Sequence, residues 1–242
     1  MTVSASAERR ALLLVFAGFG AFWGAWAALV PAIQQQTGLN DGQLGLCFAA
    51  IAGAALPAMR LSGRLVDRYG AARLMPAALL LFALAVPLPA LAHGAVALSL
   101  GCVLLGLATG VLDVVANVAT AAWERLEDER LMALCHAAFS AGLLVGSVAT
   151  GLSRDSGAGP GLVLPVVAGL LLVLSLRQPR YRLARIDGTP ADGHGLPRAL
   201  LMIGLLVAAA FLVEDAVQSW SALRLERGLG AAPWLSGLGP GL

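Results

Sequence analysis

Two polar residues interrupt an apolar run near the middle of the chain and could carry proton chemistry. Asp113 and Asn117 lie in the run 95–122, and their spacing of four places both side chains on one face of a helix. Arg125 follows Asp113 by twelve residues, which at about 1.5 Å per residue is roughly 18 Å. A membrane core of about 30 Å would hold Asp113 near its midplane. A carboxyl there favours its neutral form and suits proton exchange, although packing against a neighbouring helix is the alternative role.

A second polar pair lies near the end of the chain. Glu214 and Gln218 are four residues apart and can share one helix face. Glu214 and Asp215 are adjacent, about 100° apart around a helix, so they cannot both face a cavity. We expect Glu214 and Gln218 to face such a cavity. The alternative is that the segment marks the membrane surface, where carboxyls and Trp220 are readily accommodated.

Two further pairs could contribute to a binding site. His136 and Ser140 lie one helical turn apart in the run 133–152, where a histidine serves either proton coupling or a hydrogen bond between helices. Trp23 and Trp26 are three residues apart and could stack on a sugar ring, or they could pack against other helices. Of these, His136, Trp23 and Trp26 complete the set of candidate binding or coupling residues.

The elements that must position these residues are membrane-spanning helices. Hydrophobic residues make up 59% of the chain and charged residues 12%, against roughly 45–50% and 25% in soluble domains. The mean hydropathy is +0.82. Apolar runs long enough to span a bilayer predict an all-α integral membrane protein with seven transmembrane helices. The runs are 11–33, 43–62, 74–92, 95–122, 133–152, 160–176 and 199–219, and an eighth could begin at Trp234.

Arginine placement predicts the orientation. All sixteen basic residues are arginine, and thirteen fall on one side if the N-terminus is cytoplasmic, which is the bias expected of a plasma membrane or bacterial inner membrane protein. The other three are Arg154, Arg224 and Arg227. The net charge of +2 gives no reason to expect nucleic acid as a partner.

Glycine spacing and composition predict the packing and the domain organisation. Small residues four apart let helix backbones approach closely in lipid. Such pairs are Gly20 and Gly24, Gly106 and Gly110, and Gly142 and Gly146. The segment 177–198 is rich in Arg, Pro, Gly and Asp and predicts a cytoplasmic linker. It would divide a six-helix domain, 1–176, from the start of a second domain, 199–242.

The turn after the second run carries a family signature. Residues 63–73 read GRLVDRYGAAR, which resembles the G-x-x-x-D-R-x-G-x-x-R motif of the major facilitator superfamily between spans two and three. Glycines permit a tight reversal of the chain. The resemblance implies that Asp67 meets a helix of the second half of the transporter and acts in gating. The signature residues are Gly63, Asp67, Arg68, Gly70 and Arg73.

Two other segments resemble the fucose:proton symporter-like branch of that superfamily. Residues 110–117 read GVLDVVAN, similar to its G-x-L-(E/D)-x-x-x-N pattern, and residues 211–221 are similar to its glutamate and Ser-Trp pairing. In that branch the acidic residue takes the proton and the asparagine contacts sugar, which implies these roles for Asp113 and Asn117. The superfamily has twelve spans, so the seven predicted here would be its N-terminal half plus span seven, and a C-terminal half could be missing.

These observations predict a secondary active transporter, a proton-coupled symporter of a sugar or similar polar metabolite. One alternative is a truncated fragment that inserts without transporting. Another is a drug or metabolite efflux member, although span four lacks an intramembrane arginine and span five lacks a Gly-Pro element. An enzyme is not expected, because no G-x-S-G serine and no cluster of aspartates occurs. No cofactor or metal is expected either, since Cys47, Cys102 and Cys135 have no metal-ligand spacing.

Overall fold

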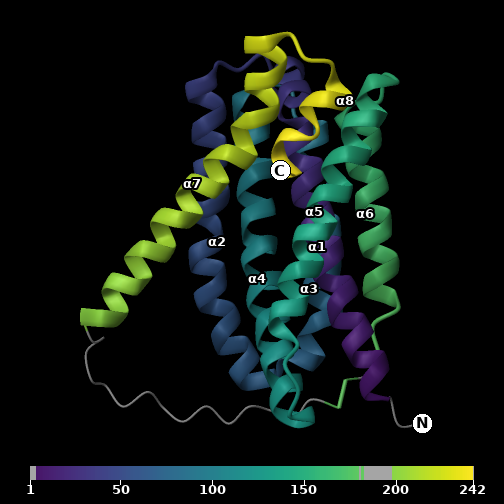
Figure 1. Cartoon of the computed structure of the whole chain (residues 1–242), viewed down its shortest axis with the longest axis vertical. Coiled ribbons are helices and arrows are strands. Elements are labelled where there is room, and N and C mark those ends of the chain that lie inside the picture. Colours follow the sequence, from purple (N-terminus) through teal and green to yellow (C-terminus); the bar gives the residue numbers. More distant parts are fainter. Residues whose placement is uncertain (1–3, 180, 183–197, 242) are drawn as a thin grey trace.

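The structure is a computed structural model that describes residues 4–179, 181–182 and 198–241. It is a bundle of long antiparallel helices (Figure 1). The helices are α1 (Ala5–Thr37), α2 (Asp41–Tyr69), α3 (Ala71–Ala85), α4 (Ala95–Glu127), α5 (Met132–Asp155), α6 (Pro160–Leu176), α7 (Arg198–Leu229) and α8 (Pro233–Ser236), with short 3₁₀ helices at Leu88–Leu91 and Gly239–Gly241. The predicted all-α fold is confirmed.

Local sequence signals fix where the first helices begin and end. The Ser4 side chain accepts a hydrogen bond from the Ala7 backbone N–H and caps the start of α1. Gly38, with φ of 68°, ends α1, and Asn40 with Gln43 forms a capping box at the start of α2. These closely spaced signals leave only a short connection, so α1 and α2 run antiparallel.

The glycine pairs lie where helices pack most closely, as their spacing predicts. An added Cβ on Gly20 would lie 2.0 Å from the Phe139 carbonyl oxygen, and one on Gly142 would lie 2.1 Å from that of Ala17, so α1 and α5 approach backbone to backbone. An added Cβ on Gly106 would lie 2.2 Å from the Ile51 carbonyl oxygen in α2. The bundle is therefore built on two close pairs, α1 with α5 and α2 with α4.

Five of the described helices, α1, α2, α4, α5 and α7, extend further than their apolar runs. In the described part of the chain, six helices are long and apolar enough to cross a membrane, if α3 is counted together with the 3₁₀ turn that follows it. Helix α6 is a shorter apolar helix of 17 residues. Hydropathy detects only the apolar part of a helix, whereas the backbone hydrogen bonds of the helix continue into its polar ends. The run 74–92 does not form one continuous helix, because α3 ends at Ala85 before Pro87 and Pro89.

The sequence predicts that residues 63–73 form a loop with two turn glycines, but helix α2 continues through most of this segment to Tyr69. Gly63, Asp67 and Arg68 lie in the last turns of α2. Only Gly70 forms the reversal, with φ of 82°, a conformation that L side chains rarely adopt. The signature therefore joins two helices through a single residue. No eighth long helix begins at Trp234, which lies in the four-residue α8.

The two ends of the bundle differ in charge and in closure. We call the end where α1 begins the basic end, since Arg10, Arg64, Arg125 and Arg177 lie on the helix termini there. At this end the Arg182 side chain hydrogen-bonds Glu8 at 3.0 Å and Glu127 at 2.6 Å. The linker predicted at 177–198 is described only at 177–179, 181–182 and Arg198, and residues 183–197 lie outside the described part.

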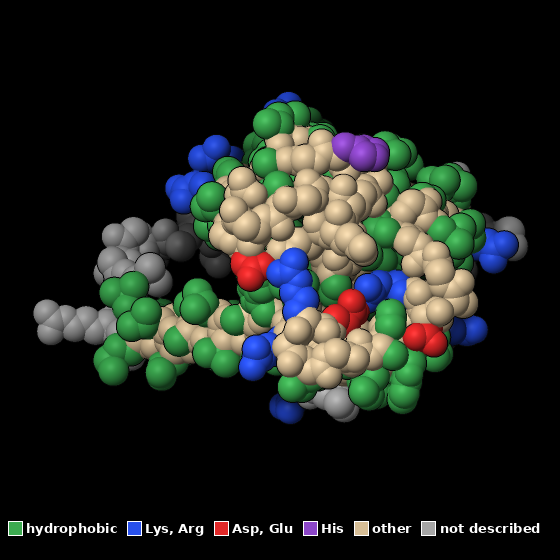
Figure 2. Space-filling model, turned by 90° about the horizontal axis from the view of Figure 1, so that it is seen from above, with side chains coloured by type: hydrophobic (Ala, Val, Ile, Leu, Met, Phe, Trp, Pro, Cys, Tyr) green, Lys and Arg blue, Asp and Glu red, His purple; other side chains and the backbone are tan. Residues whose placement is uncertain are grey.

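Helix α7 packs on the bundle only through its C-terminal part. It projects away from the other helices at its N-terminal end (Figures 1 and 2). The side chains of residues 200–217 are all exposed in the described chain, and most are apolar. From residue 218 onward, α7 and the following short helices contact α1 and α5 at the opposite end of the bundle.

Candidate functional site

The Asp113 and Asn117 side chains meet on one face of α4. The Asn117 Nδ2 group donates to the Asp113 carbonyl oxygen at 2.9 Å and to its carboxylate Oδ1 at 3.2 Å. Both residues are half-buried, so neither is sealed in the core. The spacing of four thus produces the shared face that the sequence predicts, and it leaves a carboxyl with an amide partner in an otherwise apolar stretch of helix.

His136 reaches this region from α5. Its ring is exposed, and it packs edge-on against the ring of Phe16 with centroids 5.5 Å apart. The imidazole lies close enough to the Asp113 carboxyl for a charge interaction. Ser140, one turn further along α5, is also exposed. Three candidate residues from two helices, Asp113, Asn117 and His136, therefore form one polar region, which we call the α4–α5 polar site.

A further polar residue of α4 was not predicted. The hydroxyl of Thr109 is buried, and no hydrogen-bond partner for it lies among the described residues. Thr109 precedes Asp113 by four residues, so it continues the line of Asp113 and Asn117 along the helix. The same four-residue spacing could have identified it. No group of three or more His, Cys, Asp or Glu residues in the described chain could hold a metal ion.

Glu214 and Gln218 are paired but lie on a different element. The Gln218 Nε2 group donates to Glu214 Oε1 at 3.0 Å on α7, in agreement with their spacing. Glu214 is exposed on the projecting part of the helix, as is Asp215. No hydrogen bond joins this pair to the α4–α5 polar site among the described residues.

The tryptophans of α1 are packing residues in this structure. Trp26 is 2% exposed, and its ring lies 5.8 Å from that of Phe48. Phe48 in turn lies 5.8 Å from Trp220, so an aromatic chain connects α1, α2 and α7. Trp23 is half-buried beside Phe22, with ring centroids 5.1 Å apart. Burial leaves Trp26 no free face for a solute.

The family signature residues lie at the basic end. Asp67, Arg68 and Arg73 are exposed, and the Arg68 guanidinium lies 5.3 Å from the centre of the Tyr69 ring. Just beyond α6, hydrogen bonds to Glu8 and Glu127 raise the pKa of Arg182, so that guanidinium stays charged. Charged groups therefore tie together helix ends at the basic end, away from the α4–α5 polar site.

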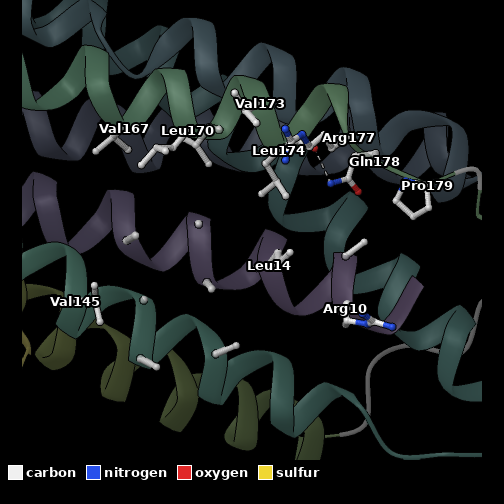
Figure 3. A pocket seen from close by; sticks show the side chains of 18 of the residues that line it. Arg10, Leu14, Val145, Val167, Leu170, Val173, Leu174, Arg177, Gln178 and Pro179 are labelled. Atoms are coloured by element: carbon white, nitrogen blue, oxygen red, sulfur yellow. Dashed lines mark hydrogen bonds between the residues drawn. The ribbon is translucent and has the colours of Figure 1, made fainter. Parts of the chain in front are cut away.

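A long groove runs along the outside of the bundle between α1, α5 and α6 (Figure 3). Its volume is about 910 Å³, and its lining is almost entirely apolar. Arg10, Arg177 and Gln178 lie at one end of it, at the basic end of the bundle. The groove contains neither Asp113 nor His136, so it is separate from the α4–α5 polar site.

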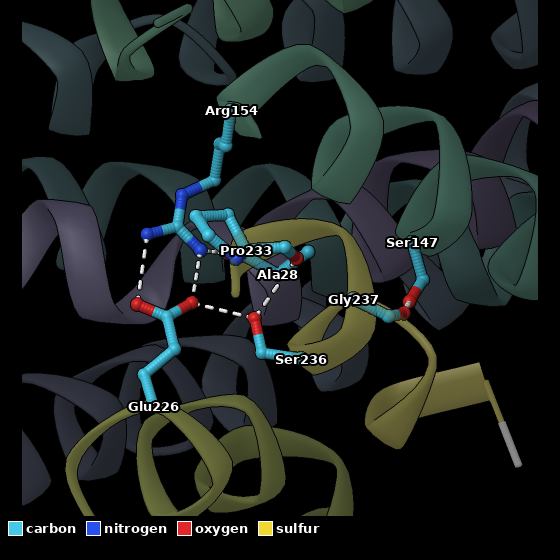
Figure 4. Close-up of polar contacts among 7 residues, drawn as sticks. All are labelled: Ala28, Ser147, Arg154, Glu226, Pro233, Ser236 and Gly237. Atoms are coloured by element: carbon cyan, nitrogen blue, oxygen red, sulfur yellow. Dashed lines mark hydrogen bonds and ion pairs between the residues drawn. The ribbon is translucent and has the colours of Figure 1, made fainter. Parts of the chain in front are cut away.

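The opposite end is closed by polar contacts that the sequence did not reveal (Figure 4). Arg154 at the end of α5 binds Glu226 of α7 through two hydrogen bonds of 2.5 and 3.1 Å, and it also donates to the Ala28 carbonyl oxygen at 2.9 Å. Ser236 donates to the same glutamate at 2.5 Å. These contacts join α1, α5, α7 and α8, and only the tertiary structure brings the four segments together.

Backbone contacts reinforce this closure. The Ser147 hydroxyl hydrogen-bonds the Gly237 carbonyl oxygen. An added Cβ on Gly237 would lie 2.8 Å from the Gly151 Cα, so the chain after α8 lies directly on the backbone of α5. A bundle of long apolar helices, of which six in the described chain could each cross a membrane, has the architecture of a multi-pass membrane protein.

Comparison with known families agrees with this architecture. The profile of the Major Facilitator Superfamily matches residues 11–242, so the chain belongs to this superfamily of transporters. It is 31% identical over 231 residues to an uncharacterised MFS-type transporter of Yersinia pestis, covering 94% of this chain and 59% of that protein. It is 29% identical over 214 residues to membrane protein MosC of Rhizobium meliloti, covering 86% of this chain and 51% of that protein. The chain thus spans half to three fifths of the length of these relatives.

A solved structure shares the fold. The crystal structure of the nucleoside transporter NupG matches with a TM-score of 0.71 at 12% sequence identity, covering 95% of this chain and 62% of that one. At this identity the likeness establishes the fold alone. The predicted major facilitator-type bundle is confirmed.

Proposed function

We propose that the chain carries the proton-coupling half of a symporter for a small polar solute, such as a sugar. The observation that carries this proposal is the hydrogen-bonded pair of Asp113 and Asn117 with His136 nearby. The resemblance of residues 110–117 to the fucose:proton symporter-like branch supports it.

In this proposal Asp113 exchanges the proton and Asn117 contacts the solute. A charged carboxyl is costly in the membrane interior, so Asp113 is neutral when water is excluded and releases its proton when water enters. The amide oxygen of Asn117 can accept a hydrogen bond from a solute hydroxyl, and the bond from its Nδ2 group to Asp113 Oδ1 links solute binding to the state of the carboxyl. His136 receives or supplies the proton on the water-accessible side of Asp113.

Alternating access would use the closure at the opposite end. Contacts of Arg154 with Glu226, and of Ser147 with Gly237, close that end while α7 is splayed at the basic end. A transporter must open each end in turn. The contacts of Arg154 and Ser147 would break when the end opposite the basic end opens. In this proposal the N-terminus lies in the cytoplasm, as the arginine distribution predicts, so the end that Arg154 and Glu226 close faces away from the cytoplasm.

The test is Asp113→Asn in the complete transporter reconstituted in liposomes with an imposed pH gradient. Asparagine keeps the size and hydrogen bonding of the side chain but cannot titrate. We expect gradient-driven accumulation of labelled sugars to be lost, while exchange of solute across the membrane without net proton movement survives. Asp155→Asn, at the end of α5, is the matched control. Unchanged accumulation per folded Asp113→Asn molecule would remove Asp113 from the coupling mechanism.

A non-transporting fragment is the second candidate function, and the exposed apolar side chains of residues 200–217 favour it. Large apolar faces of this kind pack against further helices or lipid. The 242-residue chain alone should insert and fold but show no solute uptake above empty liposomes. Co-expression with helices that cover α7 should restore uptake, and transport by the 242-residue chain on its own would disprove the fragment hypothesis.

A further inference from the structure

The groove between α1, α5 and α6 has the dimensions of one leaflet of a bilayer. Along α6 it extends from Val167 to Arg177, ten residues or about 15 Å. Along α1 its lining runs from Ala7 to Ala21, fourteen residues or about 21 Å, of which the part from Arg10 to Ala21 spans about 16 Å. Half of a hydrocarbon core of about 30 Å is about 15 Å, so the groove runs from one membrane surface to the midplane.

The floor and the walls of the groove have different compositions. Small residues, among them Ala17, Gly18 and Ala141, form the floor and leave the space of about 910 Å³ open. Larger side chains stand at its edges, where Leu14 is 57% exposed and Leu170 is 68% exposed. An apolar trough of this width and depth fits a hydrocarbon chain lying along the helix axes.

The basic end of the groove is positively charged. Arg10 and Arg177 lie at its mouth and are exposed. The Arg10 Nε group donates to the Ser6 carbonyl oxygen at 3.2 Å, and neither guanidinium forms an ion pair within the described chain. The nearby acid Glu8 is fully buried and already bound to Arg182. Among the described residues, the two guanidinium groups therefore have no counter-charge, and they lie at the depth expected of lipid phosphates.

We propose that this groove binds one anionic phospholipid, with the phosphate between Arg10 and Arg177 and an acyl chain along the apolar trough. Charge complementarity selects the occupant, because a purely apolar partner would leave both arginines without a counter-charge. Basic pockets between transmembrane helices bind anionic lipid head groups for the same reason. Because α6 is short and borders the groove, the lipid covers its apolar flank and holds it against α1.

The test is a lipid titration of the purified chain in mild detergent, followed by native mass spectrometry. Phosphatidylglycerol should bind more tightly than phosphatidylcholine of the same acyl chains. The double variant Arg10→Gln with Arg177→Gln should lose roughly 30-fold in phosphatidylglycerol affinity, about 2 kcal/mol at 1.4 kcal/mol per tenfold, and bind the two lipids equally. Arg60→Gln with Arg125→Gln removes the same charge from other helices and should keep the preference.

A second variant tests the trough itself. Ala141→Trp places a large side chain in the floor and should block the lipid, whereas Ala52→Trp, on an exposed face of α2, should not. Glycerol phosphate, which has the charge but no acyl chain, should fail to displace the bound lipid. Equal affinity of the parent for both lipids, full displacement by glycerol phosphate, or an unchanged preference in the Arg10/Arg177 variant would each overturn the proposal. So would a lipid-free dimer closed over this groove.

Discussion

At the scale of single residues, the pairing of Asp113 with Asn117 explains how a carboxyl is retained inside an apolar helix. The amide satisfies one oxygen of the carboxyl, and half-burial keeps the other accessible. A carboxyl that was fully buried in the protein core could not exchange protons with water. A carboxyl that was fully exposed to water would not be coupled to solute binding. The proposed coupling role of Asp113 requires an intermediate burial of this kind.

Gly70 gives a prediction at the same scale. Its φ of 82° suits glycine, so Gly70→Ala should lower the free energy of unfolding by about 1–2 kcal/mol. Gly63 is helical and has open space around it, so Gly63→Ala should be neutral or stabilising by about 0.5–1 kcal/mol. Thermal unfolding in detergent measures both. Equal effects of the two variants would show that the signature does not depend on the conformation of Gly70.

At the scale of elements, the bundle depends on close backbone contact between helices. Gly106→Ala would place a methyl group 2.2 Å from the Ile51 carbonyl oxygen, which forces α2 and α4 apart. Overpacking of this kind costs about 1–3 kcal/mol, and we expect a lower melting temperature in detergent. Gly53→Ala, in α2 with nothing within 4 Å, is the matched control and should not destabilise the protein. A melting temperature of Gly106→Ala equal to that of the parent would contradict the close packing.

The closure at the opposite end gives a second prediction about elements. The Arg154 and Glu226 side chains are only 9% and 18% exposed, so Arg154→Gln leaves a poorly solvated carboxylate. Loss of one partner of such a pair costs about 3–5 kcal/mol when it is fully buried, and less here. We expect α7 to separate from α5 more often. A cysteine in place of Thr150, which is 3% exposed, should then react faster with a water-soluble reagent.

A double variant separates closure from general destabilisation. Arg154→Gln combined with Glu226→Gln leaves no unpaired charge, so labelling at position 150 should return part of the way to the parent rate. Additive increases in labelling would show that the two residues do not act as a pair.

At the scale of the whole molecule, the arginine distribution predicts the orientation. In a chain without native cysteines, Ser156→Cys should be labelled by an impermeant reagent from outside the cell, because it follows α5 at the opposite end. Glu129→Cys, between α4 and α5 at the basic end, should be labelled only after the membrane is opened. The reverse pattern would place the N-terminus outside.

The sequence by itself determined the class of the molecule and the positions of its main helices. Hydropathy and the spacing of small residues are local periodicities, so runs of about 20 apolar residues and glycines four apart could be identified without knowing their neighbours. The shared face of Asp113 and Asn117 followed from helix geometry alone. The motif at residues 63–73 identified the family, but its helical conformation was missed because charge ends an apolar run without ending a helix.

Only the tertiary structure decided which helices pair and what closes the bundle. The contact of Arg154 with Glu226 joins residues 72 positions apart, and that of Ser147 with Gly237 joins residues 90 positions apart. It also placed His136 beside Asp113 and buried Trp26, which the sequence left open as a solute contact. Local periodicity says which face of a helix is polar or small, but each face could pack against several partners. The choice among them depends on how all the helices fill space together.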